Sequence, residues 1–195
     1  MKAEKISIII GILVIILLGI LIIMNLGIIG VSKNRLEQDA RKKQDISSDW
    51  QVAQDVNGDM SVMLFYNEEQ NECRYAVYMT HDGISYGYFL IDGGVDGFLI
   101  DSSRSVIYED RGIALLSMNK DNVCRIEVES GAMEVIQVDP TKPFAVALPI
   151  NCGEITLYDA QGNIVTLYDT FAASGNSWTV SSASVCISIT GQCPA

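Results

Sequence analysis

The most constraining feature of the chain is an uninterrupted apolar run near its amino terminus. Residues 6–32, ISIIIGILVIILLGILIIMNLGIIGVS, contain no charged side chain and lie between Lys5 and Lys33. At about 1.5 Å of rise per residue, a helix of this length exceeds the roughly 30 Å hydrocarbon core of a bilayer. The run is also too long for the apolar core of a cleavable signal peptide. The sequence therefore predicts an uncleaved transmembrane anchor at 6–32, after a short tail at 1–5.

Three glycines recur every eight residues inside this run, at Gly11, Gly19 and Gly27. Eight residues of helix return to nearly the same side, with a drift of about 80°, so the glycines form a slanting stripe. Because small residues let helices approach closely in membranes, the three glycines are candidates for helix packing. Chance recurrence in a span rich in Gly, Ile and Leu is the competing explanation.

Charge changes sharply after the apolar run. Residues 33–43, KNRLEQDARKK, hold five basic and two acidic side chains, whereas residues 44–195 hold six basic and 21 acidic ones, a net charge of −15. Such an acidic domain disfavours nucleic acid as a partner, and the basic run can contact anionic lipid headgroups. Glu37 with Arg41 and Asp39 with Lys43 stand four residues apart in the favourable order, which predicts a helical stalk or linker over 33–54.

Alternating apolar and polar residues, broken by frequent turn signals, predict a β-rich globular domain over 55–195. The many short strands exceed what one open sheet accommodates, so we expect an antiparallel β-sandwich or a barrel-like domain. One hairpin is predicted to turn at Asp82-Gly83. A second is predicted around residues 161–163, with the repeated TLYD at 156–159 and 166–169 on its two strands.

The stretch DVNGDM, residues 55–60, has the beginning of a calcium loop. Asp55, Asn57 and Asp59 supply oxygen ligands at the first, third and fifth loop positions, as in an EF-hand. Met60 then occupies the glycine position and Tyr66 the position of the last acidic ligand. We therefore interpret the stretch as a polar turn before a strand, and keep the three residues as candidates for a metal site completed by distant carboxylates.

The segment VDGFLIDSSRSVI, residues 95–107, resembles the catalytic-loop segment of retropepsin-like aspartic proteases. Asp101 and Ser102 match the Asp-Thr/Ser-Gly motif, but Ser103 stands in the place of its glycine. The resemblance implies a catalytic Asp101 that needs a second aspartate from a dimer mate or another lobe. The sequence favours the competing interpretation, a β-turn between two buried strands.

Composition excludes most other catalytic sites, although the 21 carboxylates after residue 43 leave a pair of acids for glycoside hydrolysis open, with no two of them singled out. His81 is the only histidine, so histidine triads and multi-histidine metal sites cannot form within one chain. The histidine itself is expected to be an exposed turn residue. We predict no enzymatic activity and no cofactor.

The five cysteines all follow the anchor: Cys73, Cys124, Cys152, Cys186 and Cys193. Cys73 and Cys124 open the similar stretches CRYAVYM and CRIEVES, so a disulfide between two strand starts is one hypothesis. Cys186 and Cys193 bracket ISITGQ and are candidates to close a small loop, which leaves Cys152 over. Fifteen such arrangements with one free thiol are possible, so the connectivity stays open.

Two features favour opposite orientations in the membrane. The positive-inside rule places the side with residues 33–43 in the cytoplasm, whereas the cysteine-rich domain is typical of an oxidising compartment. Because charge bias is a weaker guide when a long domain must cross, we expect an extracytoplasmic or extracellular domain, with a virion membrane as one such setting.

These features predict a membrane-anchored structural or assembly protein with a protein partner or self-association. Its layout is similar to that of type IV pilin-like subunits or of virion envelope components, although the processing site of pilins is missing. The alternative is a single-pass ligand- or partner-binding module that uses Tyr75, Tyr78, Tyr86 and Tyr88. An aspartic protease is the least favoured hypothesis.

Overall fold

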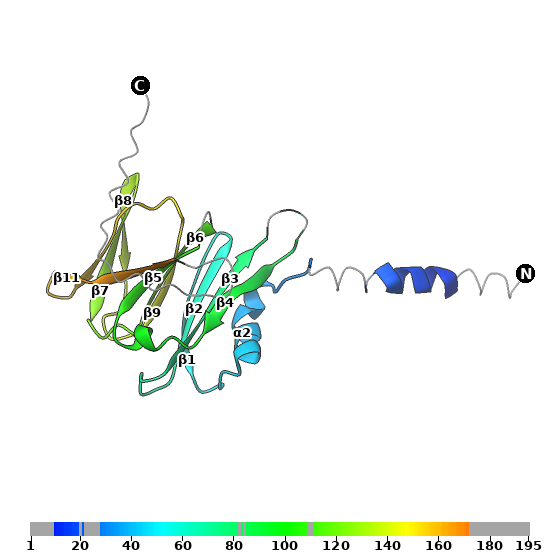
Figure 1. The fold of residues 1–195 in the computed structure, drawn as a ribbon, viewed down its shortest axis with the longest axis horizontal. Helices are drawn as coiled ribbons and strands as arrows, with labels where there is room; N and C mark the ends of the chain where they lie inside the picture. The colour runs from blue at the N-terminus through cyan, green and yellow to red at the C-terminus, as the bar shows by residue number, and fades with distance from the viewer. Residues whose placement is uncertain are drawn as a thin grey trace, which may run out of the picture.

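The computed structural model describes residues 10–19, 21, 28–81, 83, 85–108 and 111–171. In this part the chain forms twelve β-strands, a helical segment at residues 10–19, the helix α2 (Leu36–Gln44) and two short 3-10 helices, η1 (Lys33–Arg35) and η2 (Gly97–Ile100). The predicted mainly β fold is confirmed. The strands form three four-stranded sheets, of which two are wholly antiparallel (Figure 1).

The first sheet is an antiparallel meander in the order β1-β2-β3-β4. Its strands are β1 (Gln51–Asn57), β2 (Met60–Tyr66), β3 (Cys73–Thr80) and β4 (Tyr88–Gly94). The predicted hairpin that includes Gly83 is present, since β3 pairs with β4. Sequence neighbours therefore pair throughout this sheet, which keeps its contacts local.

The other two sheets are less local. The central sheet has the order β12-β5-β6-β9, with β5 (Ser103–Tyr108), β6 (Gly112–Ser117), β9 (Phe144–Leu148) and β12 (Leu167–Phe171). The third sheet has the order β11-β10-β7-β8, with β7 (Val123–Ser130), β8 (Ala132–Gln137), β10 (Ile155–Asp159) and β11 (Ile164–Val165). Strand β12 pairs in parallel with β5. The second TLYD therefore contributes to β12 in the central sheet, and its predicted place in the hairpin with the first TLYD is wrong.

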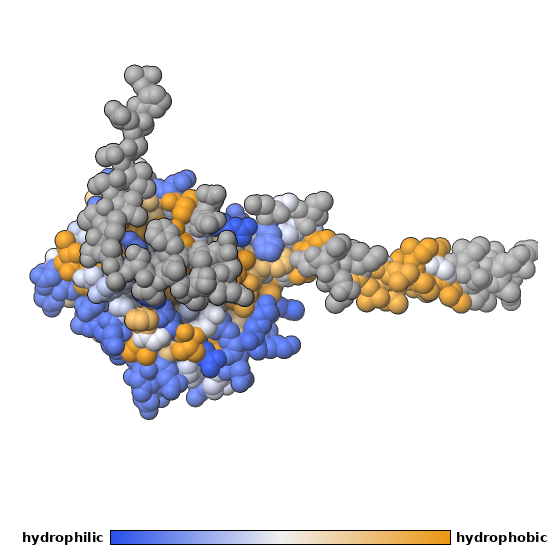
Figure 2. All heavy atoms as spheres, in the orientation of Figure 1, coloured by the Kyte–Doolittle hydropathy of each residue, from blue (hydrophilic) through white to orange (hydrophobic). Residues whose placement is uncertain are grey.

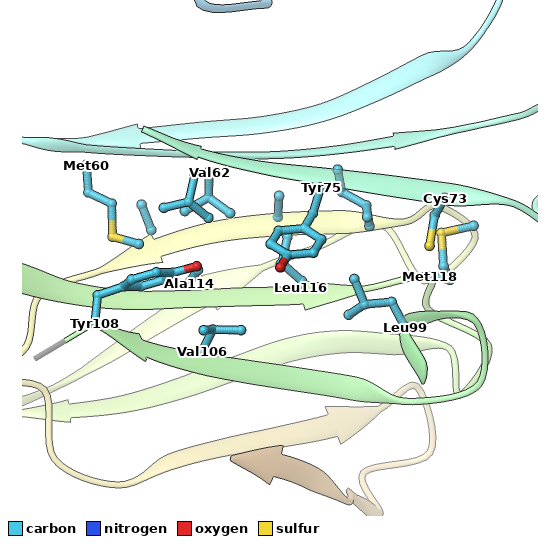
Figure 3. Close-up of a cluster of buried hydrophobic side chains, with 14 of the residues drawn as sticks. Met60, Val62, Cys73, Tyr75, Leu99, Val106, Tyr108, Ala114, Leu116 and Met118 are labelled. Carbon is cyan, nitrogen blue, oxygen red and sulfur yellow. The ribbon is translucent and has the colours of Figure 1, made fainter. Parts of the chain in front are cut away.

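Three apolar clusters hold these layers together. The first lies between the first and central sheets and includes Val62 and Tyr75 facing Val106 and Leu116 (Figure 3). The second lies between the central and third sheets, and the third lies between the first sheet and α2. The layers thus follow the order α2, first sheet, central sheet, third sheet.

Burial on two faces explains the sequence of the inner strands. Every residue of β2, β6 and β9 is buried. Strands covered on both faces have near-continuous apolar runs, such as FAVAL in β9, and lose the alternation of a half-exposed strand. By contrast, every residue of the edge strand β8 except Ile136 is exposed.

The amino-terminal segment differs from the predicted anchor. Residues 10–19 are helical, and residues 28–31 are extended because they bond to residues 86–88. The helix predicted for 6–32 therefore does not continue to its last residues. Among the described residues, none of the helices has both the length and the apolar character needed to cross a membrane.

The segment after the predicted anchor packs on the first sheet. Leu36 and Ala40 of α2 are fully buried against the outer face of the first sheet. Asp45 ends the helix in a left-handed conformation, and β1 begins six residues later at Gln51. Of the predicted stalk at 33–54, the residues from 51 onward thus belong to the sheet, and its helical part packs on that sheet.

Candidate functional site

The anchor junction is the most distinctive local structure of the described chain, and it consists of residues 28–31 and 86–88. Gly30 N–H donates to the Tyr86 carbonyl at 2.7 Å, and Tyr86 N–H donates to the Ile28 carbonyl at 2.9 Å. Val31 and Tyr88 exchange two more backbone bonds, each of 2.8 Å. The segment that leads from the apolar helix is thereby paired with the chain entering β4.

Two glycines make this close approach possible. A Cβ atom on Gly30 would lie 2.6 Å from the Tyr88 carbonyl oxygen. Gly87 has a φ of +90°, and its Cβ would lie 2.8 Å from the Val31 carbonyl oxygen. Because real Cβ atoms do not approach backbone oxygens so closely, any side chain at either position would displace the paired segments.

Helix α2 continues the attachment beyond the junction. The Arg41 guanidinium bonds to Glu37 at 2.8 Å and donates to the carbonyl oxygens of Ser47 and Trp50 at 2.7 and 2.9 Å. The Tyr78 hydroxyl donates to Asp39 at 2.7 Å. These bonds connect α2 both to the first sheet and to the loop that leads into β1.

The predicted calcium-loop residues have a structural role. Asp55 accepts a hydrogen bond from Ala147 N–H at 3.0 Å, and Asn57 donates to the Ala147 carbonyl at 3.1 Å. Two β1 side chains thus bond the outer edge of β9 and link the first sheet to the central one. Asp59 lies in the exposed turn before β2. In the described part of the chain, no three His, Cys, Asp or Glu side chains are placed to hold a metal ion.

A groove follows this contact where edge strands of all three sheets meet. Its cavity of about 430 Å³ lies between β1 and β8, with β9 beside them. We call it the edge groove, and its lining includes Gln54, Asp55, Glu134, Ile136 and Val146. The groove carries acidic and amide groups over apolar walls and has no basic residue in its lining. Such a surface suits an extended or basic protein segment better than an anion.

Asp101, the protease candidate, lies in an exposed turn directly after η2. The adjacent Ser102 hydroxyl donates to the Phe98 carbonyl at 2.6 Å. Nearby, Arg104 is buried and pairs with Asp96 at 2.6 Å while its guanidinium covers the Phe98 ring. The buried charges of this region thus form a structural ion pair, and Asp101 is outside it.

A motif that sequence reasoning missed is Gly-Ile-Ser-Tyr-Gly at 83–87, which matches the Gly-x-Ser-x-Gly pattern of a nucleophile elbow. In that motif the serine stands between a strand and a helix and bonds to an imidazole. Here strand β4 follows, and the Ser85 hydroxyl donates to the backbone carbonyl of His81 at 2.7 Å. The exposed His81 ring stacks on Phe89, with 4.1 Å between ring centroids. The local context of a nucleophile is therefore missing.

Asp92 on β4 is a polar centre that sequence reasoning missed. It accepts hydrogen bonds from the Tyr108 hydroxyl at 2.7 Å and from the Tyr75 hydroxyl at 3.2 Å. In Figure 3 these two tyrosines reach into the core from opposite sheets. Burial, followed by the charge of Asp92, raises the pKa of both tyrosines. Strand pattern alone gave no signal for the bond to Tyr108, because β5 belongs to the central sheet whereas Asp92 and Tyr75 belong to the first.

The remaining tyrosine candidates differ in exposure. Tyr78 is fully buried, and burial together with its bond to Asp39 raises its pKa. Tyr88 is half-buried and donates to the Gly58 carbonyl at 2.8 Å, whereas Tyr86 is 70 % exposed. The four tyrosines therefore do not form one binding surface.

The hypothesis of a Cys73–Cys124 disulfide is wrong. Cys73, Cys124 and Cys152 are free thiols. Cys73 begins β3 in the first sheet and Cys124 lies in β7 of the third, so the central sheet separates them. Burial raises the pKa of Cys73 to about 11, which makes it a poor nucleophile. Cys186 and Cys193 are outside the described residues.

The glycine stripe is described only in part. No atom lies within 4 Å of a Cβ built on Gly11 or Gly19, so both positions have open space beside them. Gly27 is outside the described residues.

Comparisons with known protein families, curated proteins and solved structures find no match for this chain.

Proposed function

We propose that this is a single-pass, membrane-anchored structural or assembly protein that presents its β-rich domain on the extracytoplasmic side. The described part of the apolar segment supports the anchor. Its large apolar residues at positions 10, 12–18 and 21 are each 47–70 % exposed (Figure 2). A helix that is apolar on all sides and uncovered by protein needs a hydrocarbon environment to bury it.

The observation that carries the proposal is the anchor junction. Four backbone hydrogen bonds join the segment after the apolar helix to the chain at the start of β4. From residue 28 onward, the described chain is thus bonded to the first sheet. A domain fixed in this way is suited to a constant orientation at the membrane, which an assembling subunit requires.

Membrane insertion is tested with the full-length protein. Leu13→Arg with Ile16→Arg introduces two charges that each cost about 2.5–3.5 kcal/mol at the centre of a bilayer-spanning helix. We expect the native chain to resist alkaline extraction from membranes and this variant to be released. Ile164→Arg, which adds a charge at an exposed site on β11, is the control and should remain inserted. Extraction of the native chain would contradict the anchor.

The side of the membrane is tested separately. With a membrane-impermeant thiol reagent, the half-buried Cys124 and Cys152 should become labelled in intact cells or virions after denaturant loosens the domain. Labelling only after membrane lysis would place the domain in the cytoplasm, as the positive-inside rule favours.

Assembly requires self-association of the full chain, which cross-linking in detergent or nanodiscs measures.

A partner-binding module is the second candidate, and the edge groove favours it. Gln54 and Glu134 are exposed residues of the lining. If copies of the chain associate through the groove, Gln54→Arg with Glu134→Arg should prevent the cross-linking of those copies, because both substitutions place a large charged side chain in the lining. Gln161→Arg, in the exposed turn before β11, is the control. A chain that is monomeric at all concentrations would instead favour the binding module over assembly.

A further inference from the structure

The surface around the anchor junction combines exposed apolar side chains with exposed basic ones. Ile29 and Tyr86 are bridge partners in the junction and are 61 % and 70 % exposed. Lys33 and Arg35 follow within six residues and are also exposed. We call these four residues the membrane-facing surface. In Figure 1 the junction lies at the end of the domain nearest the apolar helix.

The basic residues of this region divide into two groups. Arg41 and Lys43 pair with Glu37 and Asp39 on α2, each at 2.8 Å. Lys33, Arg35 and Lys42 form no ion pair within the described part of the chain. Lys42 lies on α2, whereas Lys33 and Arg35 lie next to residues 28–31 of the junction.

Aromatic and apolar side chains beside lysine and arginine match the chemistry of a lipid interface. Tyrosine is enriched at headgroup depth, because its ring is apolar and its hydroxyl is polar. Basic side chains near an anionic surface are attracted to it. Without such residues, a domain with a net charge of −15 over residues 44–195 would be repelled by the same surface.

We propose that the membrane-facing surface binds anionic phospholipid headgroups, so that the first sheet rests on the bilayer in one orientation. This inference depends on the proposed membrane anchor, and it extends the headgroup contact predicted for the basic run at 33–43 to the paired residues Ile29 and Tyr86 of the folded domain. The hydrogen bonds of the junction hold Ile29 and Tyr86 together, and both side chains therefore enter the interface as one unit. Lys33 and Arg35 then lie at headgroup level beside them.

The test uses the full-length protein reconstituted into vesicles that contain lipid brominated on the upper acyl chain. Tyr86→Trp places a quenchable fluorophore in the proposed interface. Tyr168→Trp, on the half-exposed Tyr168 of β12, is the control, and both variants carry the same native tryptophans. We expect quenching of Tyr86→Trp to be roughly twofold stronger in vesicles with anionic lipid than in neutral ones, and Tyr168→Trp to remain unquenched.

Charge reversal isolates the role of the headgroups. Lys33→Glu with Arg35→Glu should abolish the dependence on anionic lipid, whereas Lys120→Glu with Lys142→Glu, an equal charge change at exposed sites elsewhere, should preserve it. Failure of the native chain to float with vesicles would overturn the anchor itself. Flotation with an unquenched Tyr86→Trp would overturn only the membrane-facing surface. Equal quenching in neutral and anionic vesicles would overturn the role of headgroup charge.

Discussion

The bond between Asp92 and Tyr108 offers the sharpest test of how the first and central sheets are joined. Tyr108 is 6 % exposed, and its hydroxyl donates to the Asp92 carboxylate at 2.7 Å. A hydrogen bond to a charged group contributes about 1.5–3 kcal/mol, and an unpaired buried hydroxyl costs about 1–3 kcal/mol. We therefore expect Asp92→Ala to lower the free energy of unfolding by about 2–4 kcal/mol.

A double-mutant cycle separates this bond from other effects of the substitution. In a Tyr108→Phe background the hydroxyl is absent, so Asp92→Ala should cost about 2 kcal/mol less than in the native chain. Asp92→Asn keeps an acceptor oxygen and should cost less than Asp92→Ala. Urea denaturation of the full chain in detergent, followed by far-UV circular dichroism, measures all four free energies. A coupling below about 0.5 kcal/mol would refute the proposed inter-sheet bond.

Three further outcomes follow from the described contacts. Burial raises the pKa of the tyrosines at 75, 78 and 108, so above about pH 10 the unfolded state loses protons that the folded state retains. The free energy of unfolding should therefore fall by up to about 4 kcal/mol per pH unit. Denaturation at pH 10 and pH 11 checks this, and an unchanged midpoint would contradict it. Asp55→Ala should lower the free energy of unfolding by about 1 kcal/mol because it removes the hydrogen bond from Ala147, and Asp55→Asn should lower it less. Addition of calcium should leave the melting temperature of the native chain unchanged. Gly30→Ala should increase hydrogen exchange at residues 28–31, because the added Cβ atom would displace the paired segments. Gly97→Ala is the control and should not change this exchange, because a Cβ atom on Gly97 has open space around it. Equal exchange rates in the two variants would argue against a close junction.

Strand positions were largely predictable, because they depend on local pattern. The stretches SVMLFY and CRYAVYM, at 61–66 and 73–79, coincide with β2 and β3 to within one residue. The run FAVALPI contains β9, and its lack of alternation is consistent with the burial that the structure shows on both faces of this strand. The number of sheets could not be predicted in the same way, since β12 joins β5 across more than 60 residues of sequence.

The alternating Asp and Asn residues at 55–59 show where a local pattern misleads. Oxygen ligands at every second position fit a calcium loop, but period two is also the repeat of one face of a strand. Asp55 and Asn57 are in β1 and both bond to Ala147, which only the placement of β9 reveals. The residues that resemble a metal site thus supply the side chains of a contact between the first sheet and the backbone of the central sheet.

The order of the layers connects the junction to the edge groove. The junction bonds to the first sheet, and the third sheet lies two layers away from it. At the edge groove, however, β1, β9 and β8 come together, so a partner bound there would contact edge strands of all three sheets. The central sheet is buried on both faces and therefore resists displacement. Because the sheets pack as one unit, the orientation that we propose for the first sheet at the lipid surface also determines the direction in which the groove faces.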